Sequence, residues 1–385
     1  MLLESRRRFL QAVAAAPLMG AARPVAPAAT RRERDETSRP VVLSGDGLSL
    51  SPADYVQVLE GIVERRGIAA DNYSLGGVVE ELERTLASAL GKERAIYLPT
   101  GTLANHMAVR TLARDRSRVI VPDTSHLYND SGDCAERLSQ LNLVPLAPDR
   151  ATFTRDEVRS VVERTSTGRV RTGVGALVIE SPVRRKRGEI FDFGEMRRIS
   201  AYARENDIRT HLDGARLYMA SAYTGISPRE YASHFDTVYV SLWKYFNCGS
   251  GAILAGPGDV IEGLFHMRRM FGGGLPEVWQ YAAVALHYFE DFEAEFARAV
   301  RTASSFFALA KEHPAFDIEP VPRGSNIFGL RVRGTDLYRF RERSASNGVL
   351  LPAPRPDQSG FLVTVNATWN RTDPEALVRK LVASL

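Results

Sequence analysis

Thr237-Val-Tyr-Val-Ser-Leu-Trp-Lys244 is a run of β-branched and apolar residues that ends on a lysine. Such a continuous run is typical of a strand buried on both faces of a sheet. The loop that follows, Asn247-Cys-Gly-Ser-Gly251, consists of small residues. The chain has only five lysines among 385 residues, and the other four lie in a turn, in a basic run or on expected helices. Lys244 is therefore the one lysine expected at the end of a buried strand.

Five further runs rich in Val, Ile and Leu alternate with helical stretches along the chain. They cover residues 95–98, 119–122, 176–181, 210–213 and 252–255. This alternation predicts an α/β domain with a mostly parallel central sheet and helices on both sides. In such sheets ligands bind at the carboxyl ends of the strands, where Lys244 stands.

The rest of the chain suggests a second, smaller domain. A long helical stretch over 276–310 leads to strand-like runs at 327–332 and 361–365. We therefore predict a large domain at 41–300, of which 41–70 is an N-terminal segment. A small α+β domain is predicted at 301–385.

The first residues of the chain are basic and then apolar. Ser5-Arg-Arg-Arg-Phe-Leu10 precedes an Ala-rich stretch and Ala26-Pro-Ala28, a small-residue site where a signal peptidase could cut. The order resembles a twin-arginine signal, which is an export address and not an anchor; a basic amphipathic arm is the alternative. The prediction is a signal peptide at 1–28, a charged linker at 29–40, and a periplasmic or secreted protein without stable membrane anchoring.

Charge and cysteine content limit the possible partners. The formal net charge is +4, but without residues 1–28 the chain has 46 basic and 45 acidic residues, so no nucleic-acid partner is expected. Cys134 and Cys248 could pair in an oxidising compartment or stay free. The seven histidines lack ligand spacing, so no metal site is predicted. No Gly-x-Gly-x-x-Gly opens a helix after a strand, which disfavours a nicotinamide oxidoreductase.

Lys244 and Asp213 suit carbonyl chemistry. A strand end beside Trp243 and Tyr245 would desolvate Lys244, lowering the pKa of its amine and leaving it able to attack a carbonyl. His211-Leu-Asp213 puts a carboxylate at the end of another buried strand, where it needs a cationic partner.

That partner could be a protonated pyridine nitrogen or the guanidinium of Arg216, and the residues alone leave both open. Leu98-Pro-Thr-Gly-Thr102 runs into an expected helix at 103–112. Its N–H and hydroxyl groups could hold a phosphate, although an ordinary helix cap looks the same. His126, after the next strand, could stack on a planar ring or be structural.

His211-Leu-Asp-Gly-Ala-Arg-Leu-Tyr218 resembles the signature of the threonine aldolase and aromatic amino acid β-eliminating lyase family, fold-type-I enzymes that use pyridoxal 5′-phosphate (PLP). The similarity covers about residues 71–290. Its other motifs are Glu81-Leu-Glu83, Pro99-Thr-Gly-Thr102, Ser125-His126, Ile179-Glu180, Ser241-Leu-Trp-Lys244 and Arg269-Met-Phe-Gly-Gly-Gly274. Several motifs in the right order are more specific than any one alone.

The resemblance implies PLP as cofactor and a role for each matching residue. Lys244 would be the Schiff-base lysine, Asp213 the partner of the pyridine nitrogen and His126 the ring-stacking residue. Arg216 would bind the substrate carboxylate or lie beside the cofactor. The phosphate ligands would be Thr100, Gly101 and Thr102.

The resemblance also implies a lyase acting on an amino acid, most directly by Cα–Cβ cleavage of a β-hydroxy-α-amino acid to glycine and an aldehyde. β-Elimination, transamination or racemisation could use the same scaffold. A binding protein that kept the fold without turnover is the alternative of a different class. Family members are dimers or tetramers, which predicts a homodimer or homotetramer.

The departures from the family pattern fall on the substrate side. Where the family has Asn-Thr-His-Asn, this chain has Ser181-Pro-Val-Arg184, so Val183 replaces the histidine that helps with the substrate hydroxyl. The family's carboxylate-binding arginine falls on or near Leu362, and the arginine after the triple glycine corresponds to Pro276. Arg185 aligns with a family arginine and is predicted as a substrate ligand. The motifs thus identify the cofactor and leave the reaction open.

Overall fold

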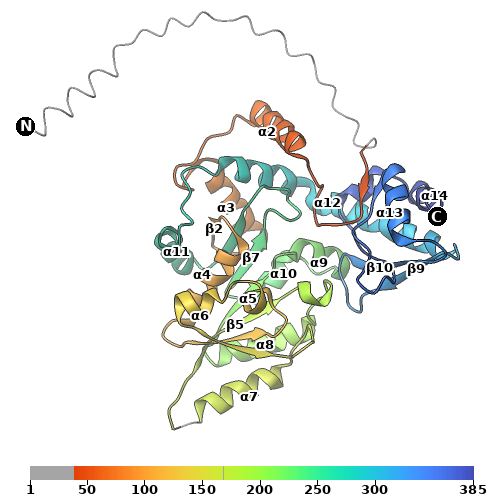
Figure 1. The fold of residues 1–385 in the computed structure, drawn as a ribbon. Helices are drawn as coiled ribbons and strands as arrows, with labels where there is room; N and C mark the ends of the chain where they lie inside the picture. Colours follow the sequence, from red (N-terminus) through yellow and green to blue (C-terminus); the bar gives the residue numbers. More distant parts are fainter. Residues whose placement is uncertain (1–38, 168) are drawn as a thin grey trace, which may run out of the picture. The chain divides into compact units, whose positions relative to one another are not determined.

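The computed structural model describes residues 39–167 and 169–385, and residues 39–385 form one compact unit (Figure 1). The predicted signal peptide at 1–28 and residues 29–38 of the predicted linker lie outside the described residues.

The centre of this unit is a seven-stranded sheet with strand order β2-β8-β7-β6-β5-β3-β4. The strands are β2 (Arg94–Leu98), β3 (Arg118–Pro122), β4 (Asn142–Leu146), β5 (Val174–Glu180), β6 (Arg209–Asp213), β7 (Thr237–Ser241) and β8 (Ala252–Gly256). β8 alone runs in the direction opposite to the other six strands. The predicted α/β fold with a mostly parallel sheet is confirmed. The edge strand β4 was not predicted, because Pro145 interrupts its apolar run.

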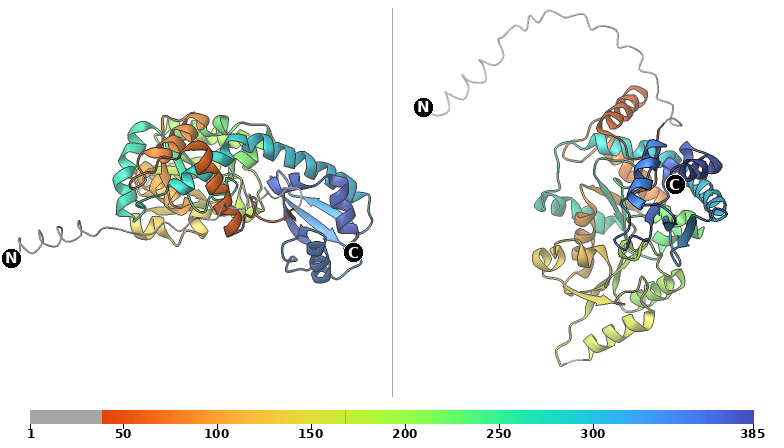
Figure 2. Two further views of the ribbon diagram at one scale, coloured as in Figure 1. Left: turned by 90° about the horizontal axis from the view of Figure 1, so that it is seen from above. Right: turned by 45° about the vertical axis from the view of Figure 1, so that its right-hand side comes forward.

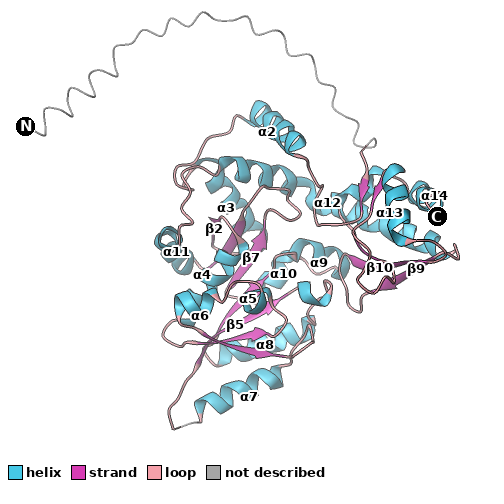
Figure 3. Ribbon diagram, in the orientation of Figure 1, coloured by secondary structure: helices cyan, strands magenta, loops and turns pink. Residues whose placement is uncertain are grey.

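Helices cover both faces of the sheet (Figure 3). Alternate residues of β5 show why. Leu177 and Ile179 pack into one buried cluster with α3 (Gly77–Leu90) and α8 (Phe193–Glu205), while Ala176 and Val178 pack into another with α4 (Gly101–Ala113). Side chains of a strand alternate between faces, so a strand covered on both sides must be apolar throughout. The helices around the sheet are α3 (Gly77–Leu90), α4 (Gly101–Ala113), α5 (His126–Asn129), α6 (Cys134–Ser139), α7 (Arg155–Ser166), α8 (Phe193–Glu205), α9 (Leu217–Thr224), α10 (Pro228–Ser233) and α11 (Gly258–Met270).

The 33-residue helix α12 (Trp279–Lys311) leads from this body to the C-terminal part (Figure 2). There β9 (Phe316–Pro320), β10 (Ile327–Val332) and β12 (Phe361–Thr364) form an antiparallel sheet in the order β12-β10-β9. The helices of this part are α13 (Leu337–Ser346) and α14 (Pro374–Val382). Because α12 crosses residue 300, the domain boundary proposed there stays a prediction.

The N-terminal segment begins on the C-terminal part, although the sequence assigns it to the large domain. Strand β1 (Val41–Val42) pairs in parallel with β11 (Val349–Leu350). The buried Asn366 side chain donates to the carbonyls of Val42, Ser44 and Gly45. Residues 43–50, here called the N-terminal strap, then run toward the end of β7 before α2 (Pro52–Arg66) begins.

The strap lies directly against the loop that follows β7. The N–H of Leu48 donates to Oδ1 of Asn247 at 2.7 Å. A Cβ at Gly47 would collide with Asn247 and with the carbonyl oxygen of Lys244. Glycine is therefore required for the close approach of the two segments.

Cys134 and Cys248 are free thiols, which answers the pairing question that the sequence left open. Among the described residues, no helix is long and apolar enough to span a membrane. Nor does the described part of the chain gather three or more His, Cys, Asp or Glu side chains as a metal site would need.

Candidate active site

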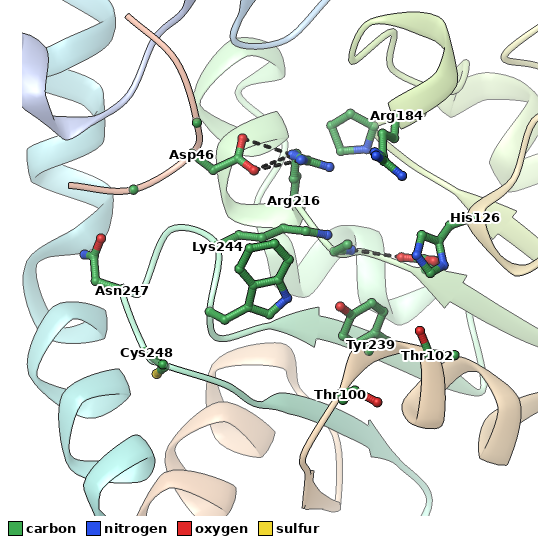
Figure 4. Close-up of a pocket in the computed structure, with 18 of the residues that line it drawn as sticks. Asp46, Thr100, Thr102, His126, Arg184, Arg216, Tyr239, Lys244, Asn247 and Cys248 are labelled. Atoms are coloured by element: carbon green, nitrogen blue, oxygen red, sulfur yellow. Dashed lines mark hydrogen bonds and ion pairs between the residues drawn. The ribbon is translucent and has the colours of Figure 1, made fainter. Parts of the chain in front are cut away.

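A cavity of about 710 Å³ opens at the carboxyl ends of β5, β6 and β7. It is lined by all but one of the predicted site residues: Thr100, Gly101, Thr102, His126, Asp213, Arg216 and Lys244. The strand register explains this convergence, because Glu180 of β5 pairs with Asp213 of β6, which pairs with Tyr239 of β7. Figure 4 shows Lys244 crossing the cavity between a wall with Asp46, Arg216 and Arg184 and a wall with Thr100, Thr102 and Tyr239.

Lys244 has the lowered basicity that its position predicts. Burial, reinforced by the charge of Arg216, lowers the pKa of the amine to about 8, although Asp213, Asp46 and Glu180 act in the opposite direction. Trp243 covers one side, with its ring centroid 5.8 Å from Nζ. A substantial fraction of the amine is thus neutral near physiological pH and able to attack a carbonyl.

Asp213 does not pair with Arg216. The alternative in which the guanidinium of Arg216 is its cationic partner is therefore wrong. Arg216 binds Asp46 instead, with Nε 3.0 and 2.9 Å from the two carboxylate oxygens and Nη2 at 2.7 Å from Oδ2. Asp213 accepts hydrogen bonds from the Asn105 side chain at 2.6 Å and from the N–H of Ala215 at 3.1 Å. Among the described residues, no cation forms an ion pair with Asp213.

A buried hydrogen-bond chain orients the Asp213 carboxylate. His211 is fully buried, which lowers its pKa to about 4 and keeps the ring neutral. Asn105 donates its amide to Asp213, so its Oδ1 must accept from Nε2 of His211, 2.9 Å away. The Nδ1 of His211 then accepts from the hydroxyl of Thr237 at 2.8 Å. From the sequence, His211 was only part of a signature and Asn105 had no role.

The N-terminus of α4 faces the cavity. Thr100 caps this helix by accepting the N–H of Leu103 at 3.2 Å. Gly101 lies so close to the Tyr239 hydroxyl that any Cβ there would collide with it. The first N–H groups of a helix have no intrahelical acceptor, so this end of the cavity suits a phosphate.

Glu180 holds two parts of the cavity wall together. Its carboxylate accepts the N–H of His126 at 2.6 Å and the N–H of Arg184 at 2.9 Å. Burial, together with the nearby Asp213, raises its pKa to about 7. The sequence placed Glu180 in a motif without a role, although an acid at the end of a buried strand was the same signal that singled out Asp213.

His126 lies at the N-terminus of α5, where burial lowers the pKa of its ring. A neutral imidazole on the cavity wall is compatible with stacking on a planar ring.

Arg185 does not line this cavity, whereas Arg184 does. Arg185 binds Asp130 through Nε at 3.2 Å and Nη2 at 2.7 Å, and it lines a second cavity beside the C-terminal sheet. Leu362 lines that second cavity too. Val183 is fully buried. The position thus favours Arg184 over Arg185 as a group that can face a bound ligand.

Comparison with known proteins agrees with this arrangement. The beta-eliminating lyase family is matched by residues 69–331. A low-specificity L-threonine aldolase of Candida albicans is 31% identical over 264 residues, covering 68% of this chain and 70% of that protein. An alanine racemase of Cochliobolus carbonum is 30% identical over 214 residues, or 54% of each chain. The solved structure of a putative L-allo-threonine aldolase of Listeria monocytogenes covers 90% of this chain and 97% of its own, with a TM-score of 0.74 and 27% identity.

Proposed function

Because this chain belongs to the beta-eliminating lyase family and is thereby a PLP-dependent lyase, we propose that it cleaves the Cα–Cβ bond of a β-hydroxy-α-amino acid. The products would be glycine and an aldehyde. The observation that carries the proposal is the structural match to a putative L-allo-threonine aldolase over 90% of the chain.

The residues of the cavity fit PLP. Asp213 is a buried carboxylate held by neutral donors, and a protonated ring nitrogen would supply the cation that it lacks. Lys244 would hold the aldehyde carbon of the cofactor, His126 would lie against its ring, and the start of α4 would bind its phosphate. When bound, PLP withdraws electrons from the substrate Cα and so weakens the bonds to that atom.

Cleavage also needs a group that takes the proton of the β-hydroxyl. Val183 cannot exchange a proton, so this task falls to another group or to a water molecule. Glu180 and Lys244 line the cavity with pKa values of about 7 and about 8, close to the range in which acid–base catalysis is efficient at neutral pH.

The direct test is to incubate the PLP-loaded enzyme separately with L-threonine and L-allo-threonine and to measure glycine and acetaldehyde. We expect equal amounts of both products, and none from Lys244→Ala. Consumption of either amino acid without glycine would contradict the proposal, as would conversion of the cofactor to pyridoxamine phosphate.

Racemisation is the second candidate. It is supported by the similarity to an alanine racemase and by the buried Val183, which stands where the family has the histidine that helps with the substrate hydroxyl. The enzyme would then convert L-alanine to D-alanine, which chiral chromatography detects. If D-alanine forms and threonine stays intact, racemisation replaces cleavage as the function.

We also propose export by the twin-arginine route, supported by Arg6, Arg7, Phe9 and Leu10 in the order of such a signal and by Ala26-Pro-Ala28 after the apolar stretch. Replacing Arg6 and Arg7 by lysine should leave the chain uncleaved in the cytoplasm of the producing cell. Cell fractionation followed by N-terminal sequencing measures both effects. Equal export of the variant would show that the arginines are not read.

A further inference from the structure

An amino-acid substrate carries an α-carboxylate that must be held while the bond at Cα is aligned for cleavage. Of the arginines in the described part of the chain, two line the cavity, Arg184 and Arg216. We propose that Arg184 binds the α-carboxylate of the substrate. This inference rests on the proposed function, because it names the residue that orients that amino acid.

Arg216 is committed to another partner. Asp46 of the N-terminal strap binds both Nε and Nη2, and the two side chains are only 15% and 11% exposed. Asp46 thereby occupies two of the nitrogens of the guanidinium, which leaves Arg216 fewer N–H groups for a further carboxylate. Lys244, the remaining cationic side chain of the cavity, is needed to hold the cofactor.

Arg184, in contrast, has a charge that its neighbours leave largely available. Its single contact among the described side chains is Nη1 to Oδ2 of Asp130 at 3.3 Å, and 57% of its side chain is exposed. Arg185 binds both oxygens of the same carboxylate and is the main reason that the pKa of Asp130 is lowered. Arg185 therefore neutralises Asp130, which would otherwise compete with a substrate for Arg184.

The charge of Arg184 is felt inside the cavity. Burial lowers the pKa of the His126 ring most, and the charges of Lys244 and, to a smaller extent, Arg184 lower it further. A guanidinium can bind a carboxylate through two parallel N–H donors, which fixes direction as well as affinity.

The backbone of Arg184 is held at a set place relative to the cofactor residues. One carboxylate, Glu180, accepts the N–H groups of both Arg184 and His126. In Figure 4 Arg184 lies on the wall opposite Thr100 and Thr102, where the start of α4 suits the cofactor phosphate. A carboxylate on Arg184 would thus lie at the far side of the cavity from that phosphate.

The test measures ligand binding to PLP-loaded enzyme, with the visible absorption of the cofactor as the readout. Glycine carries the carboxylate, and glycine amide is the same ligand without it. We expect Arg184→Gln to raise the Kd of glycine by about 10- to 100-fold, the usual effect of losing charged hydrogen bonds. The Kd of glycine amide should change less than about two-fold. The Kd of glycine for Arg184→Lys should lie between those of Arg184→Gln and the wild type, because lysine keeps the charge but lacks the two parallel N–H donors of a guanidinium.

Lys186→Gln is the matched control, since it removes the same charge from the same short turn without lining the cavity. Equal glycine affinity in the two glutamine variants would overturn the proposal, and so would loss of the cofactor band in Arg184→Gln. The outcome is separable from the proposed function. If Arg184→Gln binds glycine weakly while the wild type does not cleave threonine, Arg184 is upheld and the aldolase reaction is refuted. If the wild type cleaves threonine while Arg184→Gln binds glycine as tightly as Lys186→Gln does, the aldolase reaction is upheld and the role of Arg184 is refuted.

Discussion

At the scale of single residues, burial sets the reactivity of Lys244. Water stabilises the charged form of the amine, so the partial exclusion of water by burial lowers the pKa of Lys244. Three nearby acids raise this pKa again, but only in part. The amine is therefore mostly protonated below about pH 8 and mostly neutral above.

Capture of PLP by the cofactor-free protein should follow this titration. Only the neutral amine attacks the aldehyde, so the rate at which the visible band develops should rise with pH and level off above about pH 8. Stopped-flow absorbance over pH 6–10 measures it, and Lys244→Ala should show no band. A rate that still rises tenfold per pH unit above 9 would mean that the lysine is not desolvated.

The Asn105–His211 chain acts at the same scale, on the carboxylate that faces the cofactor. Removing one partner leaves a buried polar group unsatisfied, at a cost of about 1–3 kcal/mol. His211→Ala should therefore weaken PLP binding roughly 10-fold, as measured by equilibrium titration. His211→Gln offers a donor to Asn105 and should restore part of the affinity. Unchanged affinity in His211→Ala would show that Asp213 needs no such support.

At the scale of elements, the N-terminal strap connects the C-terminal part to the cavity. The Asn366 amide donates to the carbonyls of Val42, just before the strap, and of Ser44 and Gly45 within it. Further along the strap, Asp46 binds Arg216 and the N–H of Leu48 donates to Asn247. The side wall of the cavity thus depends on contacts made more than 300 residues away in the chain.

Asn366→Ala should loosen this strap. We expect a loss of about 1–3 kcal/mol in the free energy of unfolding by urea, since the carbonyls of Val42, Ser44 and Gly45 lose the hydrogen bonds from the buried Asn366 amide. Limited proteolysis should also cut the segment before α2 faster. Asn370→Ala is the control, because Asn370 lies in the short helix (Ala367–Arg371) that Asn366 caps but is only half-buried and bonds to Glu295. Equal protection of the segment in both variants would contradict this role.

At the scale of the whole molecule, an exposed apolar surface lies around the triple glycine. Met270 is 72% exposed, and Tyr73 and Leu75 are 43% and 51% exposed. Tyr73 stacks under Arg269 and bonds through its N–H to Pro276, which places these residues around the same loop. Exposed apolar side chains gathered near one loop are typical of a subunit interface, so we expect this loop to contact a second copy of the chain.

Light scattering of the purified protein should give two or four times the mass of one chain. Met270→Asp would place a charge in the expected interface and should lower that mass, whereas Val56→Asp, on the exposed face of α2 and itself 63% exposed, should not. A monomeric wild type would refute the predicted homodimer or homotetramer.

The sequence by itself determined the six predicted strands of the central sheet and the placing of Lys244 and Asp213. These features are local: buried strands must be apolar throughout, and the carboxyl ends of parallel strands meet at one edge. Only the tertiary structure decided which partner each charge takes. Asp46 and Arg216 are 170 positions apart, and Asn105 and His211 are 106 apart, so no spacing reveals either pair. Arg184 and Arg185 are adjacent, yet in one short turn they point to different cavities, because successive side chains of a helical turn diverge.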